Sequence, residues 1–112
     1  MADDLIPLAA AARLAYRRVF GTQLERAPSN DELDLVALAL SAHLAIYGVH
    51  APGRPIARIS EPDLLAGMFC GGAARFETVH RPGVMLQLSV EWRELDQTLG
   101  KLERERNEPW HV

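Results

Sequence analysis

The chain of 112 residues is poor in cysteine, in aromatic side chains and in net charge. Its single cysteine, Cys70, excludes an internal disulfide, and such low cysteine usage fits a reducing compartment, so we expect a cytoplasmic protein. The net charge of −3 provides no basic surplus of the kind that nonspecific nucleic-acid binding requires. The apolar fraction of 48% and the charged fraction of 24% are typical of a globular protein. We therefore expect one domain, residues 1–112, with 107–112 as a flexible tail.

Export and membrane signals are also lacking. The first residues are acidic where a signal peptide carries bases, and Pro7 interrupts the apolar run that follows. The longest apolar run, residues 33–49, is near the lower length limit of a membrane span and contains Asp34 and His43. The sequence therefore predicts no contact with a membrane.

The most apolar part of the chain is the stretch Leu33 to Tyr47, LDLVALALSAHLAIY. Ser29 and Glu32 precede it with the spacing of a capping box, so we expect a helix that begins there and runs to Gly48. A helix that is apolar around its whole circumference must be surrounded, either by the fold or by a second subunit. An amphipathic helix over residues 4–20 is expected to pack antiparallel on one side of it.

The rest of the chain alternates between turn signals and short periodic segments. In order, we expect a loop at 49–55, an extended piece at 55–59, a helix capped by Ser60 and ended by Gly71-Gly72, a β-hairpin over 74–90 and a helix over 91–106. The predicted class is α+β: an N-terminal helical hairpin with a buried central helix, a third short helix, a β-hairpin and a C-terminal helix. Residues 55–59 are the candidate third strand of a small antiparallel sheet.

The register of the hairpin depends on its turn. A three-residue loop at 81–83 sets Phe76 opposite Leu88 and Thr78 opposite Leu86, which gives one mostly apolar face. A two-residue type II turn centred on Pro82-Gly83 is the alternative, and it would break this pattern. We favour the first register because it keeps the alternation of apolar and polar residues.

The C-terminal helix carries one narrow apolar stripe with the width of a coiled-coil seam. Its members, spaced 3, 4 and 3 residues apart, are Trp92, Leu95, Leu99 and Leu102. Two heptads are too few to specify a coiled coil, so the preferred interpretation is a helix laid on the hairpin and the central helix. The alternative is a homodimer contact.

The residues that carry chemistry show no metal-ligand spacing. They are His43, His50, Cys70, His80 and His111. Cys70 is expected at the C-terminus of a helix, where the dipole raises a thiol pKa and opposes nucleophilic reactivity. An enzyme would need His43, Cys70 or His80 to converge on a pocket. We therefore predict no enzyme, no cofactor and no metal.

Two segments resemble a bacterial helix-turn-helix motif: Ile-Ser-Glu-Pro-Asp-Leu-Leu-Ala at 59–66 and Arg-Phe-Glu-Thr-Val-His-Arg at 75–81. The resemblance implies a transcriptional regulator in which the second segment is a recognition helix, and it would make Arg75, Thr78, His80 and Arg81 contacts to DNA. The link between the segments is longer here than in that motif, so the hairpin is the preferred interpretation. A DNA-binding regulator of helix-turn-helix or winged type, using residues 60–81, is the alternative function.

The function that we expect is surface contact by a small non-enzymatic regulatory or inhibitory protein. Its partner would be another protein, with nucleic-acid-handling proteins among the candidates, or a second copy of the chain in a homodimer. The exposed hairpin and the acidic C-terminal helix are the expected contact surfaces. The candidate partner-binding residues are Arg75, Glu77, Arg81, Gln87, Glu94, Glu103, Glu105 and Glu108.

Overall fold

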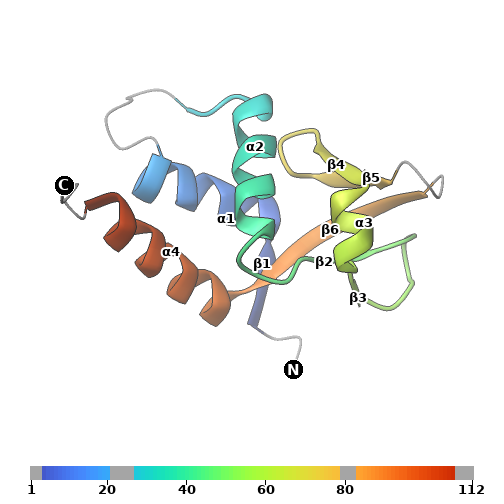
Figure 1. Cartoon of the computed structure of the whole chain (residues 1–112). Coiled ribbons are helices and arrows are strands. Elements are labelled where there is room, and N and C mark those ends of the chain that lie inside the picture. The colour runs from blue at the N-terminus through green and yellow to red at the C-terminus, as the bar shows by residue number, and fades with distance from the viewer. Residues whose placement is uncertain (1–3, 21–26, 79–82, 108–112) are drawn as a thin grey trace.

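The computed structural model describes residues 4–20, 27–78 and 83–107, and Figure 1 labels its elements. In chain order they are β1 (Leu5–Pro7), α1 (Leu8–Ala15), a π-helical turn η2 (Tyr16–Phe20), α2 (Asn30–Ser41), β2 (Tyr47–Val49), β3 (Ala57–Arg58), α3 (Glu61–Leu65), β4 (Gly67–Cys70), β5 (Arg75–Thr78), β6 (Gly83–Glu91) and α4 (Trp92–Asn107). The predicted α+β class is confirmed. Among the residues that the structure describes, no helix combines the length and the apolar composition of a membrane span.

The strands form one antiparallel sheet around β6. One edge of β6 pairs with β2, which in turn pairs with β3, so the predicted strand within 55–59 is confirmed. The other edge pairs with β5 through the first half of β6 and with β1 through its end. Strand β4 follows β5 and closes the order β3-β2-β6-β5-β4.

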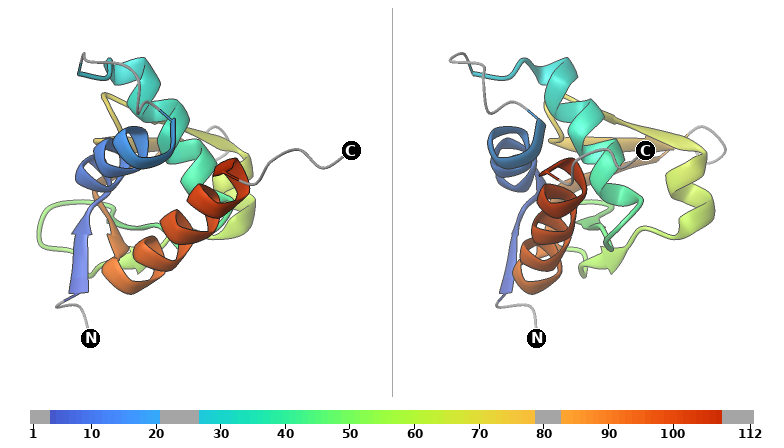
Figure 2. Two further views of the ribbon diagram at one scale, coloured as in Figure 1. Left: turned by 90° about the vertical axis from the view of Figure 1, so that its left-hand side faces the viewer. Right: turned by 60° about the vertical axis from the view of Figure 1, so that its left-hand side comes forward.

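One hydrophobic core joins the helices to one face of this sheet. In Figure 1 and in the right-hand view of Figure 2, α1 and α4 lie at one end of the molecule, α2 stands in the middle, and the β4–β5 hairpin and α3 lie at the other end. The fully buried large side chains of the core are Leu8, Leu40, Ile46, Phe76, Val90, Leu95 and Leu99. On the opposite face of the hairpin, Met68 and Val84 are exposed.

The central helix differs from its prediction in length. Helix α2 ends at Ser41, and residues 47–49 form β2 instead of a last helical turn. The reason is long-range pairing, because Tyr47 lies opposite Ser89 of β6. Gly48 permits this close approach, since a Cβ there would lie 3.1 Å from the carbonyl oxygen of Leu86.

The central helix also differs in its surroundings, and this difference matters for function. Its inner face is buried through Leu33, Val36, Ala37 and Leu40. Its outer face is not covered: Leu35 is 66% exposed and Leu38 is 51% exposed. The fold itself therefore covers this helix on its inner face only, so the first of the two expected surroundings, the fold alone, is incomplete.

The N-terminal helix is shorter than the predicted 4–20. Residues 5–7 form β1 because they pair with the end of β6, with Ile6 opposite Val90. Pro7, with a φ of −58°, stands at the N-cap, and α1 begins at Leu8.

The third helix ends at Leu65, before the predicted stop at Gly71-Gly72. The next residues pair with β5 as strand β4 and so cannot continue the helix. The two glycines instead form the β4–β5 turn, where their φ values are +68° and +77°.

The predicted hairpin is confirmed, but its register is wrong. Phe76 lies opposite Met85 instead of Leu88, and Thr78 lies opposite Gly83 instead of Leu86. The link between the paired residues is thus longer than the predicted three-residue loop, and residues 79–82 lie outside the described ranges.

The physical reason for the register error is an irregularity in β6. Gln87 has a φ of +50°, and the pairing of β2 with β6 shifts there, as at a β-bulge. Because of the bulge, Met85 and Leu88 are both buried although they are three residues apart. In a regular strand, residues three apart point to opposite faces of the sheet.

The C-terminal helix is confirmed as α4, and Asn107 is its last residue. Leu95 and Leu99 are fully buried within their own chain, where α4 packs on η2 and β6. Of the four residues proposed as a dimer contact, only two remain at the surface: Trp92, which is 45% exposed, and Leu102, which is partly exposed. Residues 108–112 of the predicted tail lie outside the described ranges.

Candidate functional site

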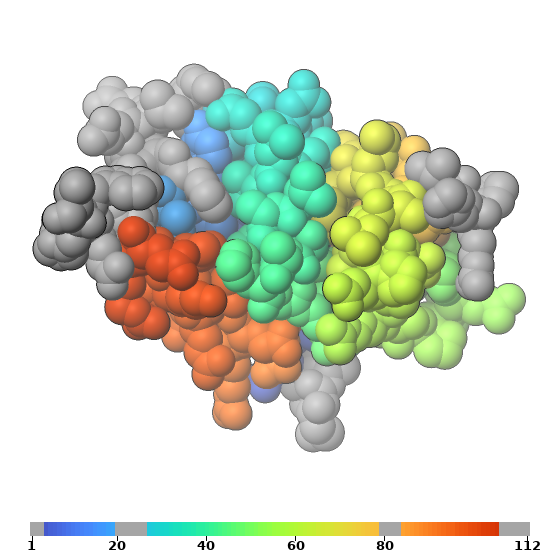
Figure 3. All heavy atoms as spheres, viewed as in Figure 1, coloured from blue at the N-terminus to red at the C-terminus, as the bar shows by residue number. Residues whose placement is uncertain are grey.

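A groove of about 760 Å³ lies beside the C-terminal half of α2 and faces the viewer between α2 and α3 in Figure 3. We call it the α2–α3 groove. It is lined by Leu38, Ser41, Ala42, His43, Leu44, Ala45, Tyr47, Arg58, Ile59, Glu61, Leu64, Leu65 and Glu94.

The first wall of the groove is the outer face of α2. Asp31, Leu35, Leu38 and Ala42 are spaced 4, 3 and 4 residues apart, so they lie on one helical stripe, and all four are exposed. Leu38 and Ala42 line the groove, and Leu35 extends the apolar wall by one turn. The helix is held at its start by a capping box between Ser29 and Glu32.

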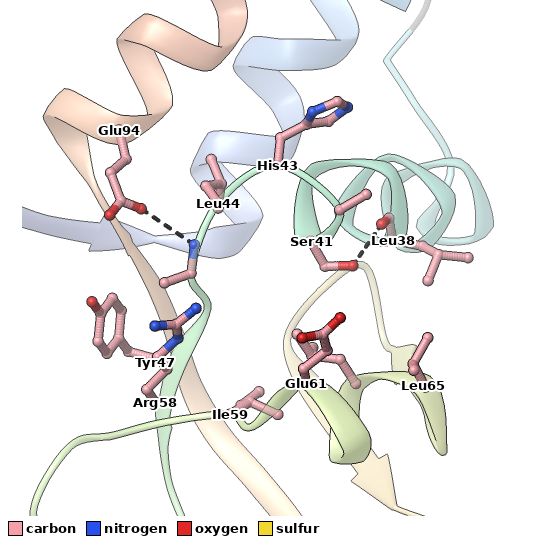
Figure 4. Close-up of a pocket in the computed structure, with 13 residues that line it drawn as sticks. Leu38, Ser41, His43, Leu44, Tyr47, Arg58, Ile59, Glu61, Leu65 and Glu94 are labelled. Atoms are coloured by element: carbon pink, nitrogen blue, oxygen red, sulfur yellow. Dashed lines mark hydrogen bonds between the residues drawn. The ribbon is translucent and has the colours of Figure 1, made fainter.

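The second wall is α3. The Ser60 hydroxyl accepts a hydrogen bond from the amide of Asp63 at 3.4 Å, and Pro62 stands in the first turn, so the helix begins sharply. Leu64 packs against the core, whereas Leu65 is 84% exposed. Leu65 and Leu38 lie at the same end of the groove in Figure 4.

The chain after α3 is anchored to the far end of α2. The amide of Ala73 donates to the carboxylate of Asp34 at 2.6 Å. Gly72 lies against Asn30, because a Cβ at Gly72 would come within 2.7 Å of Asn30 Oδ1. Residues 61–74 therefore run antiparallel to α2, from the groove at its C-terminal end to the loop at its N-terminal end.

The other end of the groove is polar (Figure 4). Tyr47 and Arg58 face each other across the β2–β3 pair, and the Glu94 carboxylate accepts a hydrogen bond from the amide of Ala45 at 3.2 Å. Glu61 begins α3 on the same side of the helix as Leu65, one turn away. The charged lining residues are thus two carboxylates and one guanidinium, which leaves this end acidic.

The groove holds no arrangement for nucleophilic catalysis among its described residues. The Ser41 hydroxyl donates to the carbonyl of Leu38 at 2.6 Å, and the His43 ring points away from Ser41 in Figure 4. Cys70 does not line the groove. Burial, followed by the nearby Glu77 carboxylate, raises the pKa of its thiol, which opposes reactivity. His80 lies outside the described ranges.

The part of the chain that the structure describes contains no candidate metal site. No group of three His, Cys, Asp or Glu side chains there is placed to hold an ion.

The predicted hairpin contacts lie on a different surface from the groove. The Nε of Arg75 pairs with a carboxylate oxygen of Glu77 at 3.2 Å on the sheet face that the helices do not cover. Gln87 is exposed at the bulge of β6. Arg81 lies outside the described residues. The structure therefore presents Arg75, Glu77 and Gln87 at the surface, and none of the three lines the groove.

The predicted acidic contacts on α4 have separate roles. Glu94 holds the turn at Ala45, and Glu103 pairs with Arg18 of η2, so both tie α4 to the rest of the chain. Glu105 is exposed. Glu108 lies outside the described ranges.

The alternative DNA-reading residues do not form a recognition helix. Arg75 and Thr78 belong to strand β5, and His80 and Arg81 lie outside the described residues. Extended geometry at 75–78 removes the helix that the helix-turn-helix interpretation needs.

Sequence reasoning missed the exposed leucines at the groove, namely Leu35 beside it and Leu38 and Leu65 in its lining. The first two belong to the apolar run, which the sequence places inside the fold or in a subunit interface. One signal was present: a single N-terminal helix covers only one side of such a run, and the chain has few other apolar segments to cover the rest.

Comparison of the chain with protein-family models, with curated proteins and with solved structures finds no match.

Proposed function

We propose that this protein is a small non-enzymatic regulatory or inhibitory protein that acts by binding another protein through the α2–α3 groove. The observation that supports the proposal is the exposure of three leucines on adjoining walls: Leu35 at 66%, Leu38 at 51% and Leu65 at 84%. Isolated exposed leucines are ordinary, but apolar side chains grouped around a hollow are typical of an interaction site.

The energetics favour a macromolecular partner. Burying one leucine side chain completely contributes about 1.5–3 kcal/mol, so covering three that are half exposed or more supplies several kcal/mol to a complex. Polar side chains also line the groove, with Arg58, Tyr47 and Glu94 at one end. Such an apolar centre with polar groups beside it matches the usual anatomy of a protein interface.

The DNA-binding alternative has less support. Its helix-turn-helix form would need a recognition helix at 75–78, and these residues form β5. Its winged form would instead use the β5–β6 hairpin, where the Arg75 guanidinium pairs with the Glu77 carboxylate. The groove is acidic at one end, so it would repel a phosphate backbone.

Photo-cross-linking in the cells that produce the protein tests the proposal. A photoreactive amino acid placed at Leu65 should cross-link to another protein, and the adduct should disappear when Leu38→Ser is added. The same amino acid at Ile56, which is 52% exposed but does not line the groove, is the matched control and should give no such adduct.

Two outcomes would contradict the proposal. Equal cross-linking from positions 65 and 56 would mean that the groove has no special role. An adduct only with a second copy of the chain would make the groove a homodimer contact instead of a site for another protein.

A further inference from the structure

The order of apolar and acidic side chains along the exposed face of α2 and the groove beside it limits what can bind there. Leu35 and Leu38 occupy the middle of the α2 stripe, and Leu65 of α3 lines the groove together with Leu38. Acidic side chains stand at both ends, with Asp31 at the N-terminal end of the stripe and Glu61 and Glu94 at the C-terminal end. Arg58 offsets only one of the two carboxylates there. The surface is thus apolar at its centre and acidic at its two ends.

The walls of the groove offer few backbone groups to a binding segment. Beyond the first turn, the amides of α2 are bonded within the helix, and those of His43 and Leu44 donate to the carbonyl of Leu40. The amide of Ala45 is taken by Glu94, and that of Ile59 by the carbonyl of Ile46. A segment lying here must therefore satisfy its own backbone hydrogen bonds, which a helix does and a single extended strand does not.

The same charge order disfavours a second copy of the chain as the occupant. Two copies related by a two-fold axis through Leu35 and Leu38 would pack their α2 helices antiparallel. Each acidic end would then meet the opposite acidic end of its copy, with Asp31 near the partner's Glu61. Like charges brought together in an interface oppose association.

We propose that the occupant of the α2–α3 groove is an amphipathic helix of the partner protein, apolar at its centre and carrying lysine or arginine toward both ends. The α2 stripe from Asp31 to Ala42 rises roughly 16 Å, which corresponds to about three helical turns of the occupant. Its apolar residues meet Leu35, Leu38 and Leu65, and its basic residues meet the acidic ends. This inference rests on the proposed function and specifies the chemistry of the partner.

Three synthetic peptides of roughly four turns test the inference against the full chain. The first has leucines at helical spacing with lysines toward its ends. The second keeps the leucines but carries glutamates in place of the lysines, and the third has the composition of the first with the helical spacing scrambled. Binding is measured by fluorescence anisotropy at low and high salt.

The expected result is that only the lysine peptide binds, and that its affinity falls as salt is raised. Leu38→Ser combined with Leu65→Ser should weaken it about tenfold or more, because a central apolar contact is lost. Asp31→Asn combined with Glu61→Gln should weaken it and reduce the salt dependence. Ile56→Ser, the matched control, should leave the affinity within about twofold.

The opposite results would overturn the inference. If the glutamate or the scrambled peptide binds as well as the lysine peptide, the occupant is not a basic helix, although sensitivity to the serine variants would leave the groove as a protein-binding site. If no peptide binds, or if Ile56→Ser is as harmful as the groove variants, the assignment of the occupant falls. The cross-linking at position 65 decides the proposed function separately, because it requires no assumption about the partner's chemistry.

Discussion

Gly67 shows how a single residue can determine where an element begins. It opens β4 against the Phe76 ring, where a Cβ would clash with Phe76 Cζ and would lie 2.5 Å from the carbonyl oxygen of Glu77. No side chain fits this space without moving a buried aromatic ring or a paired strand. The requirement arises from a contact between strands and leaves no local pattern, so the sequence alone could not show why the helix ends before this glycine.

Gly67→Ala is therefore expected to lower the free energy of unfolding by about 1–3 kcal/mol, as overpacking does in a filled core. Gly100→Ala is the matched control, because its Cβ would meet nothing closer than Arg104 at 3.9 Å within α4. This control should stabilise the chain by about 0.5–1 kcal/mol through helix propensity. Urea denaturation of both variants checks the pair, and equal effects would contradict the crowding at Gly67.

Cys70 is a second position where the surroundings determine behaviour. Burial raises the pKa of its thiol, and the Glu77 carboxylate raises it further. The folded chain therefore holds the thiol proton more tightly than the unfolded chain, and the resulting stabilisation is lost as pH rises above the usual thiol pKa.

The alkylation rate of Cys70 should consequently reach half its maximum at a higher pH in the folded protein than in the chain unfolded in urea. Glu77→Gln should move this midpoint to lower pH, because it removes one negative charge beside the thiol. The measurement is the rate of reaction with iodoacetamide as a function of pH. A midpoint that is the same with and without Glu77 would contradict the account.

At the scale of elements, the sequence predicted correctly those features that depend on residues close together in the chain. The capping box at Ser29 and the Ser60 cap both mark helix starts correctly, because the bonds involved span only three residues. Helix ends and strand registers depend instead on distant partners. Tyr47 leaves the helical pattern to pair with β6, and the bulge at Gln87 sets a register that no alternation of residues reveals.

The apolar stripe of α4 illustrates the same limit and leads to a prediction. Leu99 is fully buried in its own chain, so Leu99→Ala should destabilise the protein by about 2–5 kcal/mol without altering its oligomeric state. Thermal unfolding and light scattering at several protein concentrations provide the two readouts. A variant of unchanged stability that changes its mass in solution would instead make this stripe an intermolecular contact.

At the scale of the whole molecule, one core covers one face of α2 and leaves the other bare. The chain is too short of apolar segments to surround this helix, because α1 and the sheet take up its inner face and α4 packs on η2 and β6. The result is a groove whose leucines contribute little to folding. The sequence could predict that α2 is covered by the fold or by a second subunit, but it could not show which face the fold would leave uncovered.

Replacing Leu38 and Leu65 together by serine should therefore leave the free energy of unfolding within about 0.5 kcal/mol of the original, as is usual at exposed positions. Leu40→Ala, two residues further along α2 and on its buried face, is the matched comparison and should cost about 2–5 kcal/mol. Urea unfolding of the two variants distinguishes the faces of the helix. A similar loss in both would show that the outer leucines belong to the core.

The measurement that tests the central claim most directly is hydroxyl-radical footprinting of the protein, first purified and dilute and then inside the cells that produce it. Leu38 and Leu65 should be oxidised readily in the purified chain and protected in the cell, whereas Ile56 should be oxidised equally in both. Protection confined to the groove would mean that another macromolecule covers it. Equal oxidation of all three positions in both settings would contradict the account.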